Sequence, residues 1–284
     1  MSTNPTTPLP DGTDTAPATV SFEDTDASAT LDTPTALTDT PTVDPHAMRR
    51  AREDLAACHR ITVYENLHEG TWNQFSAKVP GKPGHLLLTP GMTHFSRVTA
   101  GGLVELDPEG RPVAGEGRLN QSAWAIHHPI QTARPDVACA LHVHAPYSTA
   151  LCSIDGWRLD TRGSQNAAVF HRNVAYFEYE GIVTEGDEGE RMAEALGDKR
   201  VLFLANHGVL IVADTIEKAM LFLYQLERAC MNEALVRSMG GPLKRISKEA
   251  ARHNAKMSDD ATGEAGYLEA MKEVLRREGQ DFER

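Results

Sequence analysis

The chain has 284 residues and a formal net charge of −12. Eight acidic residues and no Lys or Arg fall within residues 1–47, so removing that −8 leaves only −4 for the rest of the chain. This charge excludes nucleic acid and an anionic membrane surface as the main partner. No apolar run reaches the roughly 18–20 residues that a membrane-spanning helix needs.

Neither the N-terminal segment nor the cysteine pattern indicates a secreted protein. The N-terminus lacks a basic segment followed by an apolar one, which a secretory signal requires. The four cysteines are scattered and form no CxxC pair, so we expect buried thiols in a cytoplasmic protein rather than disulfides.

The chain divides into three parts by composition. Residues 1–47 contain thirteen Thr and seven Pro, and we expect a disordered acidic tail because such a segment buries too little apolar surface to fold. Residues 48–242 are long enough for one catalytic domain with a single core. Residues 243–284 are predicted to form a helical arm.

The first half of the domain is predicted to contain one helix, three strands and a second helix. Apolar residues recur at helical spacing over 44–67. Strands are expected within 70–78, 85–88 and 103–106. Asn120 is a good N-cap for a helix over 120–132, in which Pro129 predicts a kink or an early end.

In the second half, strands and helices alternate without a regular βαβ rhythm. We expect strands over 138–143, 201–205 and 209–212, and helices over 147–153 and 188–196. Asp214 and Glu217 resemble a capping box for a helix that runs to about Met239. This order favours the α/β class, with a mixed or antiparallel central sheet covered by helices.

Two histidines carry the first functional signal. His142 and His144 are two residues apart on a predicted strand, so their side chains project from the same face. Such a pair can present two imidazoles to one metal ion. The alternative is a structural role, because histidines at strand ends also serve as hydrogen-bonding residues.

His207 is the third candidate ligand. It follows Asn206 between two strongly apolar strands, where packing alone does not explain a polar pair, and Gly208 permits a close backbone approach. Three imidazoles with an open coordination position are typical of a catalytic metal site.

Several motifs in order resemble the class II aldolase/adducin family over about residues 50–242. They are the segments 70–76, 87–91 and 98–100, the run from Ala133-Arg134-Pro135-Asp136 through His142-Val143-His144-Ala145-Pro146 to Leu151, and Ala205-Asn206-His207-Gly208-Val209. The resemblance implies a three-layer α/β/α fold with a mostly antiparallel central sheet. It also implies a divalent metal ion held by His142, His144 and His207, and a homotetramer with active sites at subunit interfaces.

The resemblance also assigns further site residues. Gln74, Thr89, Gly91 and Ser122 fall where sugar-phosphate members of the family bind substrate, and Gln74 and Ser122 are also candidate catalytic residues. His94 follows the Thr-Pro-Gly turn and is a candidate substrate contact, and Trp124 is a candidate for the wall of an apolar pocket. Packing or surface roles are the alternatives for His94 and Trp124.

The sequence departs from the fuculose-phosphate type of aldolase in three features. Of the two serines that help those enzymes hold phosphate, only Ser122 is present. Ala123 stands where those enzymes carry a Glu that acts as a base, and a methyl group cannot move protons. No Tyr occurs near residues 163–165, where they offer an acid. Tyr176 and Tyr179 lie further on and could act as that acid only if their loop swings inward.

The hypothesis from the sequence is therefore a metal-dependent lyase that cleaves a C–C bond next to a carbonyl in a small 2-oxo or 2-hydroxy acid. The ion is Fe²⁺ or Zn²⁺, since imidazole suits both. One alternative is a non-haem Fe(II) oxygenase performing oxidative decarboxylation of an aryl 2-oxo or 2-hydroxy acid, similar to the 4-hydroxy-3-prenylbenzoate synthases of the family. Another is a non-catalytic, adducin-like scaffold.

Overall fold

The computed structural model describes residues 44–178, 187–260 and 266–284. The tail expected over residues 1–47 lies outside this part of the chain except for its last four residues. Asp44 caps the first helix by accepting a hydrogen bond from the backbone N–H of His46, and the helix begins at Pro45. The first helix therefore begins three residues before Met48.

An eight-stranded sheet forms the centre of the fold, in the order β4-β3-β2-β1-β5-β8-β7-β6. Neighbouring strands are antiparallel except β6 and β7, which are parallel. The strands are β1 (Gln74–Lys78), β2 (Leu86–Leu88), β3 (Val104–Leu106), β4 (Pro112–Ala114), β5 (Cys139–Val143), β6 (Val174–Phe177), β7 (Val201–Leu204) and β8 (Gly208–Ala213).

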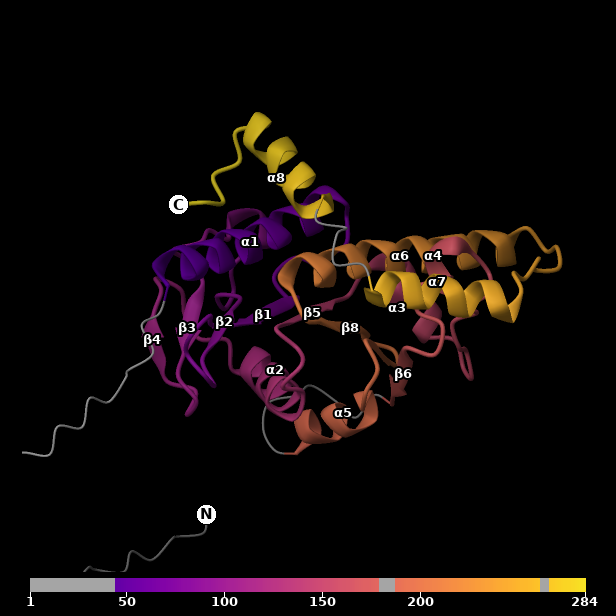
Figure 1. The fold of residues 1–284 in the computed structure, drawn as a ribbon, viewed down its shortest axis with the longest axis horizontal. Helices are drawn as coiled ribbons and strands as arrows, with labels where there is room; N and C mark the ends of the chain where they lie inside the picture. Colours follow the sequence, from indigo (N-terminus) through magenta and orange to yellow (C-terminus); the bar gives the residue numbers. More distant parts are fainter. Residues whose placement is uncertain (1–43, 179–186, 261–265) are drawn as a thin grey trace, which may run out of the picture. The chain divides into compact units, whose positions relative to one another are not determined.

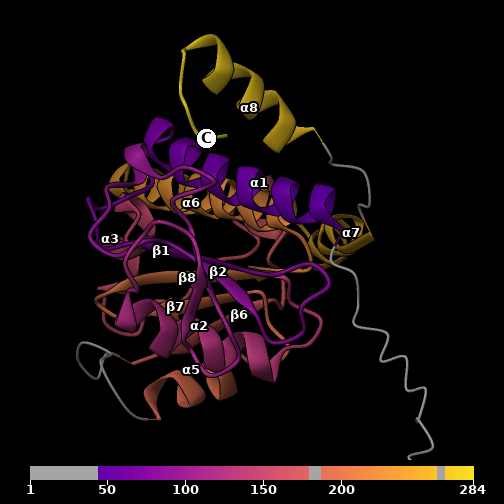
Figure 2. The same cartoon turned by 90° about the vertical axis from the view of Figure 1, so that its left-hand side faces the viewer.

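Helices cover both faces of the sheet, which gives three layers (Figures 1 and 2). One face carries α1 (Pro45–Tyr64), α3 (Pro146–Cys152) and α6 (Ile216–Ser238), and the other carries α2 (Gln121–Ala133) and α5 (Glu188–Leu196). The remaining elements are η1 (Phe95–Arg97), α4 (Gln165–Ala168), α7 (Lys248–Asp260) and α8 (Tyr267–Arg277). Helix α8 contacts α1 and α6, and α7 contacts α4. The fold is the expected α/β/α arrangement with a mostly antiparallel sheet.

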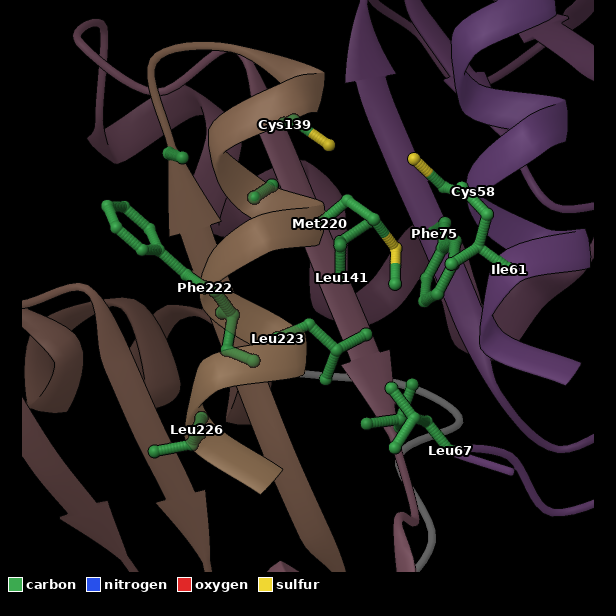
Figure 3. Close-up of a cluster of buried hydrophobic side chains, with 14 of the residues drawn as sticks. Cys58, Ile61, Leu67, Phe75, Cys139, Leu141, Met220, Phe222, Leu223 and Leu226 are labelled. Atoms are coloured by element: carbon green, nitrogen blue, oxygen red, sulfur yellow. The ribbon is translucent and has the colours of Figure 1, made fainter. Parts of the chain in front are cut away.

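Side-chain alternation on the central strands decides what faces each helical layer. Leu141 of β5 belongs to the core under α1 and α6, together with Phe75, Met220 and Leu223 (Figure 3). Its neighbour His142 must point the other way, toward α2 and α5, because successive side chains on a strand alternate. The central strand thus turns an imidazole away from the larger apolar core.

The structure corrects two local predictions. The sequence predicted a kink or an early end at Pro129; helix α2 continues through Pro129 to Ala133, so the early end was wrong. The N-cap of α6 is Thr215, whose hydroxyl accepts from the backbone N–H of Lys218 at 3.1 Å. Asp214, expected to be the cap, instead pairs with the Lys218 ammonium at 2.8 Å.

In the described ranges, every helix is too short or too polar to cross a membrane. The four cysteines are buried and unpaired.

Candidate metal centre

The three histidines singled out in the sequence lie together in the structure. His142 is on β5, His144 is one residue beyond its end, and His207 lies in the tight turn between β7 and β8. One ring nitrogen from each lies within 4.8 Å of the other two. Strands β5 and β8 are neighbours, with His142 opposite Leu210, so the fold brings residues far apart in the sequence to one point.

The β7–β8 turn has the backbone geometry that this approach requires. Asn206 adopts a φ of +56°, a left-handed conformation that Asn tolerates better than most residues. Gly208 lies so close to the end of β5 that an added Cβ would overlap the carbonyl oxygen of Val143 and lie 3.0 Å from the His144 ring. The glycine therefore lets the turn pack directly against the residues that carry the first two imidazoles.

Hydrogen bonds fix the orientation of two of the rings. Nδ1 of His142 lies 3.1 Å from the carbonyl oxygen of Val209, and Nδ1 of His144 lies 2.6 Å from a carboxylate oxygen of Glu69. Because both partners are acceptors, each Nδ1 carries a proton and donates it. Each Nε2 is then left for the centre, where the two Nε2 atoms are 3.2 Å apart.

The protonation state of the cluster suits a metal ion. Burial, followed by repulsion from His144 and His207, lowers the pKa of His142 well below its ordinary value of 6.5. Burial and His144 lower the pKa of His207 to about 4. At neutral pH these two rings are neutral, each with one unprotonated nitrogen, and neutral imidazole is the form that binds metals. Lone pairs that face one another this closely repel unless a cation lies among them, so the residues fit a divalent ion.

Gln74 and Ser122 lie beside the histidines. Gln74 is opposite His142 in the pairing of β1 with β5, and its Nε2 donates to Oγ of Ser122 at 3.2 Å. In the described residues, the other amide atom, Oε1 of Gln74, is buried without a hydrogen-bond partner. The Gln74 amide thus links β1 to the start of α2, and its oxygen can still accept a hydrogen bond.

Thr89 and Gly91 both make hydrogen bonds within the protein. The Thr89 hydroxyl is buried, accepts from the N–H of Phe75 at 2.6 Å, and lies 2.8 Å from Nε2 of His59. The N–H of Gly91 donates to the carbonyl of Arg118 at 2.8 Å. The substrate-binding roles of Thr89 and Gly91 stay predictions. His59 was missed as a partner of Thr89 because it fits the apolar pattern of its helix.

His94 and Trp124 make mainly local contacts. Nδ1 of His94 accepts from the backbone N–H of Ser96 and caps η1, while its ring lies edge-on to His68. Trp124 stacks on His128 with ring centroids 4.1 Å apart and packs against the apolar cluster under β2 and β3. Their roles as substrate contacts stay predictions.

Tyr176 lies on β6, away from the start of α2. Its hydroxyl accepts from the backbone N–H of Leu159 at 2.9 Å, and its ring is between Phe203 and the Arg158 guanidinium. It lines a cavity of about 350 Å³ that also reaches Asn206, the residue before His207. A catalytic role for Tyr176 stays a prediction, and Tyr179 is outside the described residues.

The sequence analysis did not identify two residues that contact His144. Glu69 binds its ring, as described above, and Oδ1 of Asn73 accepts from its backbone N–H at 3.0 Å. Both belong to the loop before β1. Loop residues follow no hydrophobic period, and only a three-dimensional structure brings them to the end of β5.

Comparison with known proteins gives a consistent result. Residues 53–233 match the family of class II aldolase and adducin N-terminal domains. An aldolase II superfamily protein from Pseudomonas syringae is 31% identical, with a TM-score of 0.77, over 85% of this chain and 98% of that one. The L-fuculose 1-phosphate aldolase from Glaciozyma antarctica is 26% identical, with a TM-score of 0.72, over 84% and 93%. Alpha-adducin from Rattus norvegicus is 30% identical over 73% of this chain but only 29% of the adducin.

Proposed function

Because the chain belongs to the family of class II aldolases and adducin N-terminal domains, we propose that it is a metal-dependent lyase. It would cleave a C–C bond next to a carbonyl in a small 2-oxo or 2-hydroxy acid, with Fe²⁺ or Zn²⁺ as its ion. The similarity to an L-fuculose 1-phosphate aldolase supports a lyase of the aldolase type.

One observation carries the proposal, namely the convergence of ring nitrogens of His142, His144 and His207, together with the lowered pKa values of His142 and His207. A divalent ion held by these rings would act as a Lewis acid on a carbonyl or hydroxyl oxygen of the substrate. Three neutral ligands leave the full positive charge of the ion and several coordination positions for an anionic substrate.

The neighbouring residues favour a substrate without a phosphate group. The hydroxyl of Thr89 and the N–H of Gly91 are engaged inside the protein, so they are poor phosphate donors. The unpartnered Oε1 of Gln74 is an acceptor, which suits a substrate hydroxyl better than an anion. A 2-hydroxy acid offers both a chelating carboxylate and a hydroxyl.

The absence of a Glu at Ala123 also selects among reactions. Ala123 is fully buried and gives no proton acceptor. Cleavage next to a carbonyl leaves an electron pair that the carbonyl oxygen takes up. Stabilising that developing charge contributes more than a strong base would. Loss of CO₂ from C3 of a 2-oxo acid fits this requirement, because the electron pair of the broken C–C bond is then taken up by the C2 carbonyl oxygen as an enolate.

The similarity to alpha-adducin favours a second candidate, a non-catalytic scaffold. A scaffold that does not bind a metal gains nothing from three convergent imidazoles, one of them fully buried, since each lowered pKa reflects a cost of burial. The three histidines are therefore the feature on which the two functions differ.

We also propose a homotetramer with active sites at subunit interfaces. Trp72 and Met92 support it, because they are large apolar side chains with exposed fractions of 63% and 80%. Both lie on loops next to residues assigned above to the site. A second subunit would remove these surfaces from water.

Metal content and turnover test the lyase. The purified wild type should contain about one transition-metal ion per chain by elemental analysis and should release a product from a panel of 2-oxo and 2-hydroxy acids under nitrogen. His144→Ala should lose the metal and the turnover, while His253→Ala, which alters an exposed histidine, should keep both.

The outcomes separate the candidates. A wild type that binds no metal even after reconstitution with Zn²⁺ or Fe²⁺ is a scaffold. Turnover that needs air and consumes oxygen identifies an iron oxygenase instead of a lyase. Full metal occupancy in His144→Ala contradicts the ligand assignment.

A further inference from the structure

We propose that Glu69 is a positioning residue of the metal centre, which fixes the ring of His144 and partly offsets the charge of the ion. This inference rests on the proposed metal site. It assigns a function to a carboxylate that the sequence did not single out, in a chain that lacks a carboxylate at Ala123.

Glu69 contacts the ring of His144 directly. The carboxylate oxygen of Glu69 lies 2.6 Å from Nδ1 of His144, the short distance typical of a charge-assisted hydrogen bond. An ionised carboxylate only accepts, so the imidazole proton must be on Nδ1. Nε2 of His144 is then directed at Nε2 of His142 as a lone pair. A carboxylate behind a metal-binding imidazole is a common way to fix the ring and raise its basicity.

A turn in the loop before β1 brings Glu69 to the ring of His144. The N–H of Trp72 donates to the carbonyl of Glu69 at 3.1 Å, which closes a turn through Gly70. Gly70 has a φ of +56°, and an added Cβ would meet no atom within 4 Å, so this position needs glycine for its backbone conformation rather than for space.

The same loop also holds the backbone of His144. Oδ1 of Asn73 accepts from the N–H of His144 at 3.0 Å, and the Asn73 side chain is fully buried. Glu69 and Asn73 therefore restrain His144 at the ring and at the main chain. A chance surface ion pair would not include the second, buried contact.

The negative charge of Glu69 also acts on the histidine cluster. Within the described residues, no Lys or Arg pairs with Glu69, so its negative charge is directed mainly at the histidines. It also raises the pKa of His207, against the larger effects of burial and His144. A negative charge this close to three neutral ligands favours cation binding over an empty site.

The experiment compares three variants of the metal-free protein by titration with Zn²⁺ against a competing chelator. Glu69→Ala removes both the charge and the hydrogen bond, and it should raise the Zn²⁺ dissociation constant about 10- to 100-fold. Glu69→Gln keeps an acceptor but removes the charge, so it should give a smaller increase. Glu116→Gln makes the same charge change at another exposed position and should leave the constant unchanged.

A second readout reports the ring directly. Long-range ¹H–¹⁵N correlation spectra of the metal-free protein should place the His144 proton on Nδ1 in the wild type and in Glu69→Gln, and shift it toward Nε2 in Glu69→Ala. Thermal unfolding of each variant checks that the fold is retained.

The possible failures are distinguishable. If the wild type itself does not bind Zn²⁺, the proposed metal site is wrong. If the wild type binds Zn²⁺ and Glu69→Ala binds it equally well with an unchanged His144 tautomer, only the role of Glu69 is overturned.

Discussion

Ala123 shows how one substitution within the family changes what the neighbouring residues can do. It is the third residue of α2, and its methyl group packs against Leu86, Leu88 and Val104 in a small apolar cluster. Nothing polar in that cluster could pair with a carboxylate. The position that carries a base in fuculose-phosphate aldolases is part of the core here.

Ala123→Glu is therefore expected to destabilise the protein rather than add a base. Burying an unpaired carboxylate among leucines should lower the free energy of unfolding by about 3 kcal/mol or more, or leave the new group protonated with a raised pKa. Urea denaturation at pH 7 measures this change. Gln121→Glu puts the same charge on an exposed position in the first turn of the helix and should have little effect. Equal stability of the two variants would show that the cluster opens to water.

The contact between α2 and α5 explains why a helix with an internal proline persists. Pro129 has no N–H, so it cannot donate to the carbonyl of Ala125. The backbone of Gly189 in α5 fills the space beside that carbonyl, where an added Cβ would overlap the oxygen. The proline and the glycine together let the two helices approach closely.

Gly189→Ala should lower the free energy of unfolding by about 2–3 kcal/mol, because the added methyl has no room and must separate the helices. Chemical denaturation measures the loss. Gly241→Ala is the matched control, since a Cβ there would meet nothing within 4 Å. A loss of less than about 0.5 kcal/mol at Gly189 would mean that α5 shifts freely against α2.

The strands and helices that the sequence predicted are those with strong local patterns. The apolar runs of β7 and β8 and the long stripe of α6 needed no tertiary information. β6 was missed because its four residues are only half-buried and show no alternation, and it is a strand mainly through its parallel pairing with β7. The cap of α6 was misassigned because Asp214 and Thr215 are both good caps, and only the backbone conformation chooses between them.

In the candidate site, too, some residues could be predicted from the sequence and others could not. Histidine spacing indicated which rings could meet, because strand geometry relates sequence spacing to direction. It could not reveal that Glu69 and Asn73 contact His144, or that His59 takes up the hydroxyl of Thr89. Those contacts depend on how loops and helices pack on the sheet, which no local pattern records.

Two buried histidines connect the helical layers to the sheet. His59 of α1 contacts Thr89 on one side of the sheet, and His127 of α2 lies 2.7 Å from Oγ of Ser76 on the other. Burial lowers the pKa of each to about 3, from an ordinary value of 6.5. Both are neutral in the folded protein and take up protons only when it unfolds.

The sign of the resulting pH dependence follows from this difference. Above pH 6.5 neither state binds these protons, so the full stability is present. Between pH 6.5 and about 3 the unfolded chain binds more protons, and each histidine lowers the free energy of unfolding by about 1.4 kcal/mol per pH unit. Urea denaturation at pH 7, 6, 5 and 4.5 should show this loss.

His127→Gln, which keeps a partner for Ser76, should reduce the slope of the free energy of unfolding against pH by about 1.4 kcal/mol per pH unit, the contribution of one histidine. His253→Gln should not change the slope. An unchanged slope in His127→Gln would mean that water reaches this imidazole in the folded state and that the contact between α2 and the sheet is looser than its burial indicates.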